Sequence, residues 1–457
     1  MEYSEVTDAA SARRYVEAAN IANIKLAVTD CDGVMRGKYV SRDKFFSALD
    51  KGFGFCDVIF GWDSADELYD KDSYTGWQTA FPDAWAHIDP ASCRALPLED
   101  ERSVLFLADF ADSEAAAVCP RAALKRVLAR LDAAGFSARA AAEFEFFLFS
   151  ETPDSVREKN FHGIQPMTPD NFGYSVLRNS THADFYHRLL GTCADMGMTL
   201  EGLHTETGPG VLEAALEHSD ALLAADNATL FKTFTKVLAQ QQGLMATFMA
   251  KWSPKYPGQS GHLHISLQDK HGEAVFHDSD AEHGISQTMR WFIGGQQQLM
   301  PEVLAMIALS CNSYTRLVPG AWAPTAASWG IDNRTCALRA IPGTPAAQRV
   351  EYRAAAADIN PYLALAAAIG TGLWGIEHKI EPSKPFRGNA YEGRFAKKLQ
   401  LPTTLGEAAG RLRQSRAARE LFGDAFVDHF AYTREWEDEQ QRQAVTDWQL
   451  RRYFEII

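Results

Sequence analysis

"AAAEFEFFLF", residues 140–149, has the pattern of a β-strand with two unlike faces. Successive side chains of a strand point to opposite faces, so Glu143 and Glu145 share one face. Phe144 and Phe146 share the other face, which is apolar enough to cover a core. The simplest interpretation of an isolated Glu-x-Glu is a solvent-facing sheet edge. The flanking residues are apolar, however, and adjacent carboxylates in a buried strand repel each other unless a cation lies between them. Both interpretations remain open on this stretch alone.

The rest of the chain alternates between strand-like and helix-like patterns. The segment PRAALKRVLARLDAAGF (120–136) repeats apolar residues three and four apart, starts with proline and nearly ends with glycine, which predicts a helix. Further helices are predicted at residues 11–20, 219–250, 282–309, 359–378 and 404–457, and further strands at 199–216, 261–268 and 335–341. From residue 24 to residue 110, short apolar runs alternate with Asp and Gly turns. The predicted class is α+β, with a small N-terminal domain and a large C-terminal domain.

The composition disfavours several classes of protein. The chain has 457 residues and a formal net charge of −14, which argues against nucleic acid as a partner because phosphate-binding surfaces are usually basic. Its seven cysteines are scattered and form no Cys-x-x-Cys pair, as in a reducing cytoplasm. The N-terminus lacks the apolar stretch of a signal peptide, and the apolar window 361–376 is too short and too rich in Ala and Gly to span a bilayer comfortably. We therefore expect a cytoplasmic protein with no membrane partner.

Two further segments gather polar side chains on strands. In EGLHTETGPGVLEAAL, Glu206 and Glu213 flank a Gly-Pro-Gly turn, a geometry that brings two carboxylates to one place. In SGHLHISL, the alternation puts His262, His264 and Ser266 on one face and apolar residues on the other. A lone histidine is usually structural, but two on one strand face beside a serine favour a ligand-binding surface.

The last of these segments, QRVEYR, carries arginines. Arg349, Glu351 and Arg353 share one face of this strand, and a ladder of ion pairs is the simplest interpretation. Together with the glutamates and histidines above, however, the pattern describes an oxygen-rich site for Mg²⁺ or Mn²⁺, and such ions usually hold nucleotide phosphates. Arginine offers a forked donor for carboxylate or phosphoryl oxygens. No Walker P-loop or kinase-type glycine loop is present, so the residues predict a metal- and nucleotide-dependent enzyme with an anionic substrate.

The ordered motifs resemble one known family. EFEFFLF, HTETGPGVLE, GHLHISL, NSYTRLVPG, DNRTCALR and RVEYRAAAADINPYLALAA follow the order and spacing of the glutamine synthetase family, and the resemblance covers residues 24–445. DCDGVMRGKYV resembles part of that family's small β-grasp domain. The resemblance implies a β-grasp domain at residues 1–113. It also implies a catalytic domain at residues 114–457, with a curved antiparallel sheet flanked by helices.

The resemblance also implies a mechanism and a set of metal ligands. In the family, ATP phosphorylates the side-chain carboxylate of glutamate, and an amine then attacks the acyl phosphate to give a γ-glutamyl amide. Two divalent ions, Mg²⁺ or Mn²⁺, lie in a funnel between neighbouring subunits of a homo-oligomeric ring, a hexamer or a dodecamer. The matching positions for the first ion are Glu145, Glu206 and Glu213, and those for the second are Glu143, His262 and Glu351.

Other positions match the family's substrate contacts. Arg316, Arg353 and Gly258 match residues that bind glutamate, and Arg334 matches the arginine that stabilises the transferring phosphoryl group. A fixed positive fork suits that task. The positions that match ATP contacts are Glu201, His264, Ser266, Arg339 and Arg349.

The chain departs from the family where the nucleophile enters. The family's loop G-Y-E-A-P is GAWAP here, so Trp322 replaces a glutamate that in the family binds and deprotonates ammonium. Tyr174 matches a tyrosine of the ammonium pocket, and Asp63, in DSAD, matches the aspartate that a neighbouring subunit contributes. A lysine common in bacterial members is Ala346, and a glutamine beside a metal glutamate is Val211.

These departures predict an altered acceptor. An indole in place of a carboxylate offers a flat apolar wall and a cation–π contact of roughly 0.5–2 kcal/mol to an amine. The hypothesis is a ligase that joins glutamate to an organic amine with an apolar or aromatic body. A polyamine such as putrescine or spermidine is the alternative acceptor, since the acidic segment DSADELYDKD (63–72) could bind its second charge. Ordinary glutamine synthetase and a non-catalytic homologue are less favoured, because the metal ligands and arginines are retained.

Overall fold

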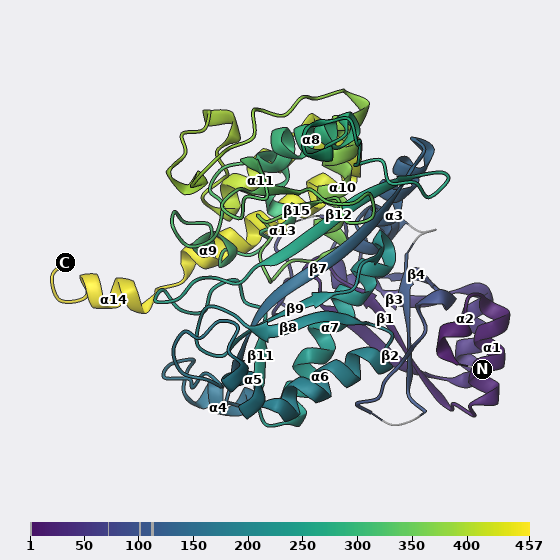
Figure 1. Cartoon of the computed structure of the whole chain (residues 1–457). Coiled ribbons are helices and arrows are strands. Elements are labelled where there is room, and N and C mark those ends of the chain that lie inside the picture. The colour runs from purple at the N-terminus through teal and green to yellow at the C-terminus, as the bar shows by residue number, and fades with distance from the viewer. Residues whose placement is uncertain (1, 72, 100–101, 111–113) are drawn as a thin grey trace.

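The computed structural model describes residues 2–71, 73–99, 102–110 and 114–457, and Figure 1 shows the whole chain. It contains a six-stranded sheet in its N-terminal part and a nine-stranded sheet in the remainder, both flanked by helices. The predicted α+β class is therefore confirmed. None of the helices that the described residues form has the length and apolar character needed to cross a membrane.

The smaller sheet is built from short segments near the N-terminus. Its strand order is β2-β1-β6-β4-β3, with β5 beside β6. The strands and helices of this part are α1 (Ala9–Ala18), β1 (Asn23–Thr29), β2 (Met35–Ser41), α2 (Arg42–Lys51), β3 (Phe53–Cys56), β4 (Asp83–Ile88), β5 (Arg94–Ala95) and β6 (Val104–Asp109). The predicted domain boundary after residue 113 adjoins residues 111–113, which lie outside the described residues, and it stays a prediction.

The larger sheet is organised around one long central strand, β7 (Phe136–Phe149). The strand order is β13-β14-β15-β12-β7-β9-β8, and β10 and β11 also pair with β7. The other strands are β8 (Leu200–Thr205), β9 (Val211–Leu216), β10 (Ser219–Asp220), β11 (Met245–Thr247), β12 (Gly261–Asp269), β13 (Trp329–Ile331), β14 (Leu338–Ile341) and β15 (Arg349–Tyr352). Because β12 and β9 pair along its two sides, β7 is no edge strand. The interpretation of its glutamates as an exposed sheet edge is wrong.

The apolar face of β7 covers the core, as its alternation predicts. Phe144 and Phe146 are fully buried, and the Phe144 ring stacks on Phe231 of helix α7 (Ala221–Gln241) with 6.2 Å between ring centroids. Helix α7 ends before the predicted residue 250 because Gly243 adopts a left-handed turn with φ +70° and the chain then returns to the sheet as β11. Packing of Phe144 and Phe146 in the core holds β7 in place, and with it the glutamates on its opposite face.

Further helices pack around this unit. Helices α3 (Pro120–Ala133), α8 (Gln287–Val303) and α10 (Pro361–Glu377) lie close to the predicted positions. A Cβ atom on Gly295 of α8 would lie 2.5 Å from the nitrogen of Gly375 in α10, so the two helices cross at a distance that only glycine permits. The remaining helices are α4 (Pro153–Glu158), α5 (Val176–Thr181), α6 (Ala183–Asp195), α9 (Ser313–Arg316), α11 (Leu405–Gln414), α12 (Arg416–Phe422), α13 (Asp424–Gln443) and α14 (Asp447–Tyr453).

Helix α13 ties the N-terminal part to the rest of the chain. Its buried Arg434 forms an ion pair of 2.6 Å with Asp32. Tyr69, in the loop that precedes β4, packs edge-on against Tyr432 and Trp436 of the same helix. The loop between β3 and β4 is therefore held against α13 by aromatic packing.

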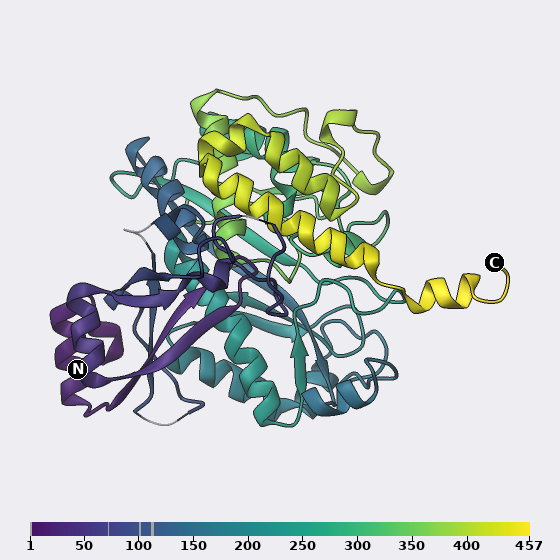
Figure 2. The same ribbon diagram turned by 180° about the vertical axis from the view of Figure 1, so that it is seen from behind.

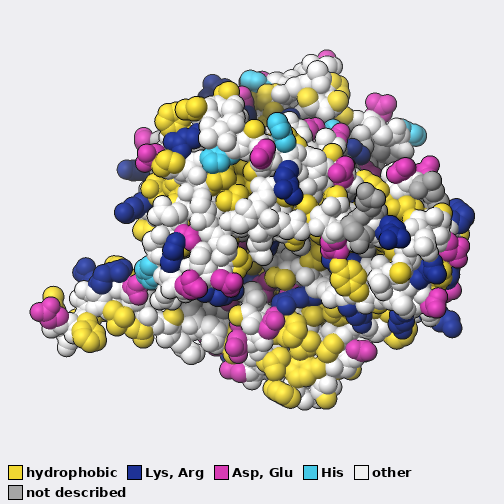
Figure 3. Space-filling view, turned by 90° about the horizontal axis from the view of Figure 1, so that it is seen from below, with side chains coloured by type: hydrophobic (Ala, Val, Ile, Leu, Met, Phe, Trp, Pro, Cys, Tyr) yellow, Lys and Arg dark blue, Asp and Glu magenta, His cyan; other side chains and the backbone are white. Residues whose placement is uncertain are grey.

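Helix α14 projects from the body of the molecule in Figures 1 and 2. His162 forms an ion pair of 2.7 Å with Asp447 at the start of this helix. Beyond that contact, Trp448 of the helix and Phe454, which follows it, are exposed apolar side chains. Figure 3 shows hydrophobic side chains along the projection.

Candidate active site

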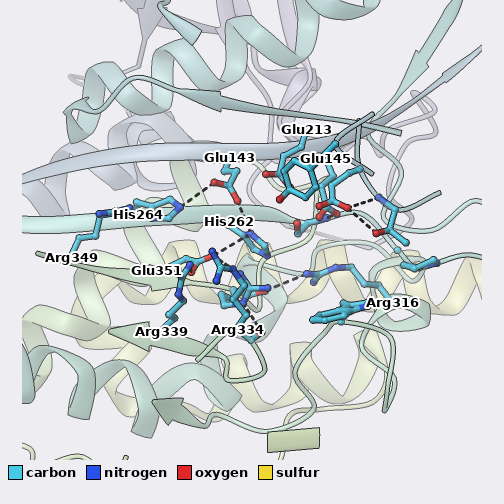
Figure 4. A pocket seen from close by; sticks show the side chains of 18 residues that line it. Glu143, Glu145, Glu213, His262, His264, Arg316, Arg334, Arg339, Arg349 and Glu351 are labelled. Carbon is cyan, nitrogen blue, oxygen red and sulfur yellow. Dashed lines mark hydrogen bonds and ion pairs between the residues drawn. The ribbon is translucent and has the colours of Figure 1, made fainter. Parts of the chain in front are cut away.

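A cavity of about 460 Å³ lies over the polar face of the larger sheet (Figure 4). The predicted site residues that line it are Glu143, Glu145, Tyr174, Glu206, Glu213, Gly258, His262, His264, Arg316, Trp322, Arg334, Arg339, Arg349, Glu351 and Arg353. The strands β7, β9, β12 and β15 supply these carboxylates and imidazoles, except for Glu206, which directly follows β8. Two of the arginines, Arg334 and Arg353, and both aromatic residues lie in loops. The fold thus brings together motifs as far apart in the sequence as those of Glu143 and Arg353.

Glu145, Glu206 and Glu213 form a carboxylate cluster on one side of the cavity. Glu145 and Glu213 lie directly opposite each other in the register of β7 and β9. Burial and the neighbouring Glu213 together raise the pKa of Glu145 to about 7, against the opposing effect of Arg316. Glu206 accepts a hydrogen bond from its neighbour Thr207. Three carboxylates that repel one another in this way form a donor set suited to a divalent cation.

A second cluster lies beside the first. One ligand atom each of Glu143, His264 and Glu351 lies within 4.8 Å of the others. His262 joins them, since its Nδ1 is 3.2 Å from Glu143 Oε1 and 3.4 Å from Glu351 Oε1. Its Nε2 is buried and has no hydrogen-bond partner among the described residues. Burial lowers the pKa of His262 to about 4, so its imidazole is neutral, the form that binds metals. The carboxylates of this cluster suit Mg²⁺ or Mn²⁺, and the neutral imidazole adds a further metal ligand.

Four of the cavity's arginines are already engaged by the protein. Arg339 and Arg353 both form ion pairs with Glu351, and Arg353 Nε also donates to the Arg334 carbonyl at 3.1 Å. Arg349 Nε lies 3.2 Å from His264 Nδ1. Arg316 is 2% exposed and donates to the backbone carbonyls of the two residues that follow Tyr352. These contacts fix the positions of the four guanidinium groups.

Arg334 differs from these four. Its side chain lines the cavity and forms no hydrogen bond or ion pair within the part of the chain that the structure describes. An uncommitted guanidinium is available to an anionic group inside the cavity, with up to five donors in a planar fork. In Figure 4 Arg334 lies beside Glu351, Arg339 and His262, next to the second cluster.

Two aromatic residues form an exposed wall of the same cavity. Trp322 is 59% exposed and Tyr174 is 70% exposed. Both have left-handed backbones, with φ of +55° and +54°, a conformation that is strained for bulky side chains. The Tyr174 ring lies on the His204 imidazole, 4.4 Å between centroids, and His204 in turn forms an ion pair with Glu213. The tyrosine is thus linked to the first carboxylate cluster.

Three predicted residues lie outside this cavity. Glu201 and Ser266 line a second cavity of about 360 Å³ that shares Glu143, His264 and Arg349 with the first. Asp63 lines neither cavity: its Oδ1 accepts hydrogen bonds from the backbone nitrogens of residues 65 and 67, and its Oδ2 accepts one from the Trp436 indole. Its assignment to an amine pocket shared between subunits stays a prediction.

The sequence analysis missed three residues that line the first cavity, namely Thr207, Pro257 and Ser260. Ser260 donates its backbone N–H to Glu145 Oε2 at 2.7 Å, so it orients a carboxylate of the first cluster. Thr207 and Ser260 lie within the quoted motifs HTETGPGVLE and SGHLHISL, and Pro257 precedes the predicted Gly258, so their positions in the sequence were the available signal.

Comparison with known proteins identifies the family. Residues 117–453 match a family model described as the catalytic domain of glutamine synthetase. The chain belongs to the glutamine synthetase family. It is 44% identical over 440 residues, 95% of this chain and 84% of the relative, to type-1 glutamine synthetase 2 of Dictyostelium discoideum.

Other members of the glutamine synthetase family that resemble this chain are named for organic amines. A glutamate–isopropylamine ligase of a Pseudomonas species is 37% identical, with 97% of each chain covered. A gamma-glutamylethanolamide synthetase of Streptomyces coelicolor is 36% identical, covering 96% of this chain and 94% of the relative. A solved structure of a GmaS/ADP complex is 28% identical with a TM-score of 0.84, covering 98% of this chain and 99% of the other.

These findings confirm the predicted resemblance, the fold of the glutamine synthetase family and the enzyme class, a carbon–nitrogen ligase. The roles of individual site residues and the ring-shaped assembly are not tested by them and stay predictions.

Proposed function

We propose that this chain is an ATP-dependent ligase that joins the γ-carboxylate of L-glutamate to a primary organic amine with an apolar body. The γ-phosphoryl group of ATP passes to the glutamate carboxylate, and ADP leaves. The amine nitrogen then attacks the acyl carbon of γ-glutamyl phosphate, an amide bond forms, and inorganic phosphate departs. The observation that carries the proposal is Trp322, an exposed indole on the wall of a cavity whose phosphate-handling residues are all present.

The two carboxylate clusters and the arginines of the cavity would carry out the phosphorylation of glutamate. Glu145, Glu206 and Glu213 would hold one divalent ion, and the residues that would hold the other are Glu143, His262 and Glu351. Bound ions supply positive charge that offsets the charge on the phosphoryl oxygens. The protein's own contribution is to orient these ligands on strands and to aim Arg334 into the cavity. Arg316 and Arg353, which are held by backbone carbonyls and, for Arg353, by Glu351, would bind the carboxylates of glutamate.

The acceptor half of the cavity favours an amine with a hydrocarbon body. A small ammonium ion binds best where a carboxylate faces it, and Trp322 offers none. The faces of Trp322 and Tyr174 provide apolar contact and attract an amine's positive charge, with roughly 0.5–2 kcal/mol from a cation–π contact. The two relatives named for isopropylamine and for γ-glutamylethanolamide support this interpretation.

A polyamine acceptor has less support, although the segment that could bind it keeps an exposed carboxylate at Glu67. The acidic segment 63–72 was the candidate for binding a second positive charge, but several of its carboxylates are engaged within the chain. Asp63 accepts from Trp436, and Asp66 forms an ion pair with Arg36. Asp70 accepts a hydrogen bond from Tyr432. Asp72 lies outside the described residues.

A panel of acceptors tests the proposed function. We expect ADP release, measured with glutamate, ATP and Mg²⁺ or Mn²⁺, to be faster with small apolar or aromatic monoamines than with ammonia, putrescine or spermidine at equal concentration. Mass spectrometry of the product distinguishes an amide from simple ATP hydrolysis. A preference for ammonia over every organic amine contradicts the proposal, and a preference for putrescine or spermidine replaces it with the polyamine alternative.

Substitution of Trp322 tests the residue itself. Trp322→Glu is expected to lower kcat/KM for the preferred amine about tenfold and to raise that for ammonia, because the indole face is lost and a carboxylate gained. Trp322→Phe is the matched control, since it keeps an aromatic face and the same left-handed backbone. If the ratio of organic amine to ammonia activity is equal in the wild type and in Trp322→Glu, the indole only covers the cavity.

A further inference from the structure

The polar face of the larger sheet continues past the carboxylate clusters into the second cavity. On β7, Arg139 lies on the same face as Glu143, four residues away, which corresponds to roughly 13 Å along the strand. On β12, Ser266 lies opposite Arg139 in the register, and Gln268, two residues further on, shares its face. All four side chains line the second cavity. A ligand whose phosphates lie at the two carboxylate clusters can therefore extend along β7 and β12 into the second cavity.

The walls of the second cavity suit a flat heterocycle. Ala141 lies between Arg139 and Glu143 on this face of β7, and its small side chain leaves space for a ligand above the strand. Pro345, Ala346 and Ala347 line the same cavity from the loop before β15. A lysine at position 346 would place a long charged chain in this space, whereas alanine leaves an apolar surface. The cavity thus combines small apolar walls with a few polar groups, as base-binding pockets do.

Arg139 is held in place by contacts with Asp220 and His218. Its NH1 is 3.0 Å from Asp220 Oδ1, and its NH2 is 3.1 Å from His218 Nδ1 and 3.2 Å from the His218 carbonyl. A guanidinium held in this way, roughly 13 Å along the strand from Glu143, keeps a planar face that can stack on an aromatic ring. Arg139 therefore fits the base end of a nucleotide better than the phosphate end.

The side chain of Gln268 is available to form hydrogen bonds with the edge of a nucleotide base. Its carboxamide has no hydrogen-bond partner within the described part of the chain, although it lines the cavity. A carboxamide offers both a donor and an acceptor, which match the N7 acceptor and the N6 amino donor of adenine. Guanine presents two acceptors, N7 and O6, at the same edge, and so leaves the carbonyl oxygen of a glutamine without a donor.

We propose that Gln268 is the residue that selects adenine in the nucleotide site, with Arg139 stacked on the base beside it. This inference rests on the proposed function in one respect: it assumes that a nucleotide binds across the two cavities. It adds the residues that determine which base is bound.

Binding of ADP and GDP in the presence of Mg²⁺, measured by titration calorimetry on the intact protein, tests the assignment. The wild type is expected to bind ADP at least about tenfold more tightly than GDP. Gln268→Leu, which keeps the side-chain volume, is expected to weaken ADP at least about fivefold and to reduce the ADP/GDP preference below about threefold. Arg139→Met is expected to weaken both nucleotides alike, since stacking does not distinguish bases.

Ser137→Ala is the matched control, because Ser137 lies opposite Gln268 in the register of β7 and β12 but does not line the cavity. It is expected to leave both affinities unchanged. Should Gln268→Leu fail to fold, Gln268→Glu replaces the donor with a charged acceptor and is also expected to weaken ADP and to reduce the ADP/GDP preference. An ADP/GDP preference that is the same in the wild type and the folded Gln268 variant overturns the assignment. Because binding needs no amine, a failed ligase assay leaves this test intact.

Discussion

Arg334→Ala is expected to lower kcat/KM for amide formation by about 1,000-fold, the scale on which a single arginine stabilises a transferring phosphoryl group. The other four arginines of the cavity are tied to carboxylates, an imidazole or backbone carbonyls. Arg334 alone among the described cavity arginines has an uncommitted side chain, so no neighbour can take over its charge. Steady-state ADP release with glutamate and the preferred amine measures the loss.

Two further variants separate the role of Arg334 from general effects of charge. Arg334→Lys keeps the charge but not the planar fork, and we expect it to recover only part of the activity. Arg387→Ala removes an equal charge from an exposed position that shares a neighbouring surface cavity with Arg334 but not the active-site cavity. That control is expected to stay within about threefold of the wild type, as distant surface charges contribute little. A tenfold or smaller loss in Arg334→Ala would falsify the catalytic role.

Glu145→Gln is expected to reduce activity about 100-fold, the upper end of the loss caused by changing residues that only support metal ligands. The stability of the metal-free protein is expected to be unchanged or higher, because one of two opposed carboxylates in the register of β7 and β9 is replaced by a neutral group of the same shape. A metal bound only by the folded state raises the melting temperature, so the rise produced by Mn²⁺ should be smaller in the variant. Differential scanning fluorimetry with and without Mn²⁺ measures this.

Glu217→Gln provides the comparison for that experiment. Glu217 is exposed and directly follows β9, so its substitution removes one negative charge close to the cluster but outside the cavity. The melting temperature of this control should respond to Mn²⁺ as that of the wild type does. An equal response in Glu145→Gln contradicts the assignment of Glu145 as a metal ligand.

The strands that carry the site could be predicted from sequence because their pattern is local. Alternation along β7 and β12 placed Glu143, Glu145, His262 and His264 on one face before their partners were known. The alternation did not reveal that β7 is central, since strand order depends on contacts between distant segments. That is why an exposed edge remained open as an interpretation of its glutamates.

The loops could be predicted less well, for a physical reason. The left-handed backbones of Trp322 and Tyr174 follow no side-chain pattern, because bulky residues seldom adopt that conformation and are held in it by surrounding structure. The end of α7 depended on a single glycine turn, Gly243. Asp63 was matched by resemblance, and only the fold shows that both its oxygens are engaged beside α13.

The division of the cavity between strands and loops has a consequence for how such an enzyme diversifies. The groups proposed to handle phosphate lie mostly on paired strands above a packed core, where a changed residue disturbs many neighbours. The aromatic wall rests on two exposed loop residues, which can be exchanged with little cost to the fold. New acceptors are therefore accessible by one or two mutations while the ATP-dependent half remains constant. Selection experiments that randomise positions 174 and 322 should yield altered amine preference far more often than inactive protein.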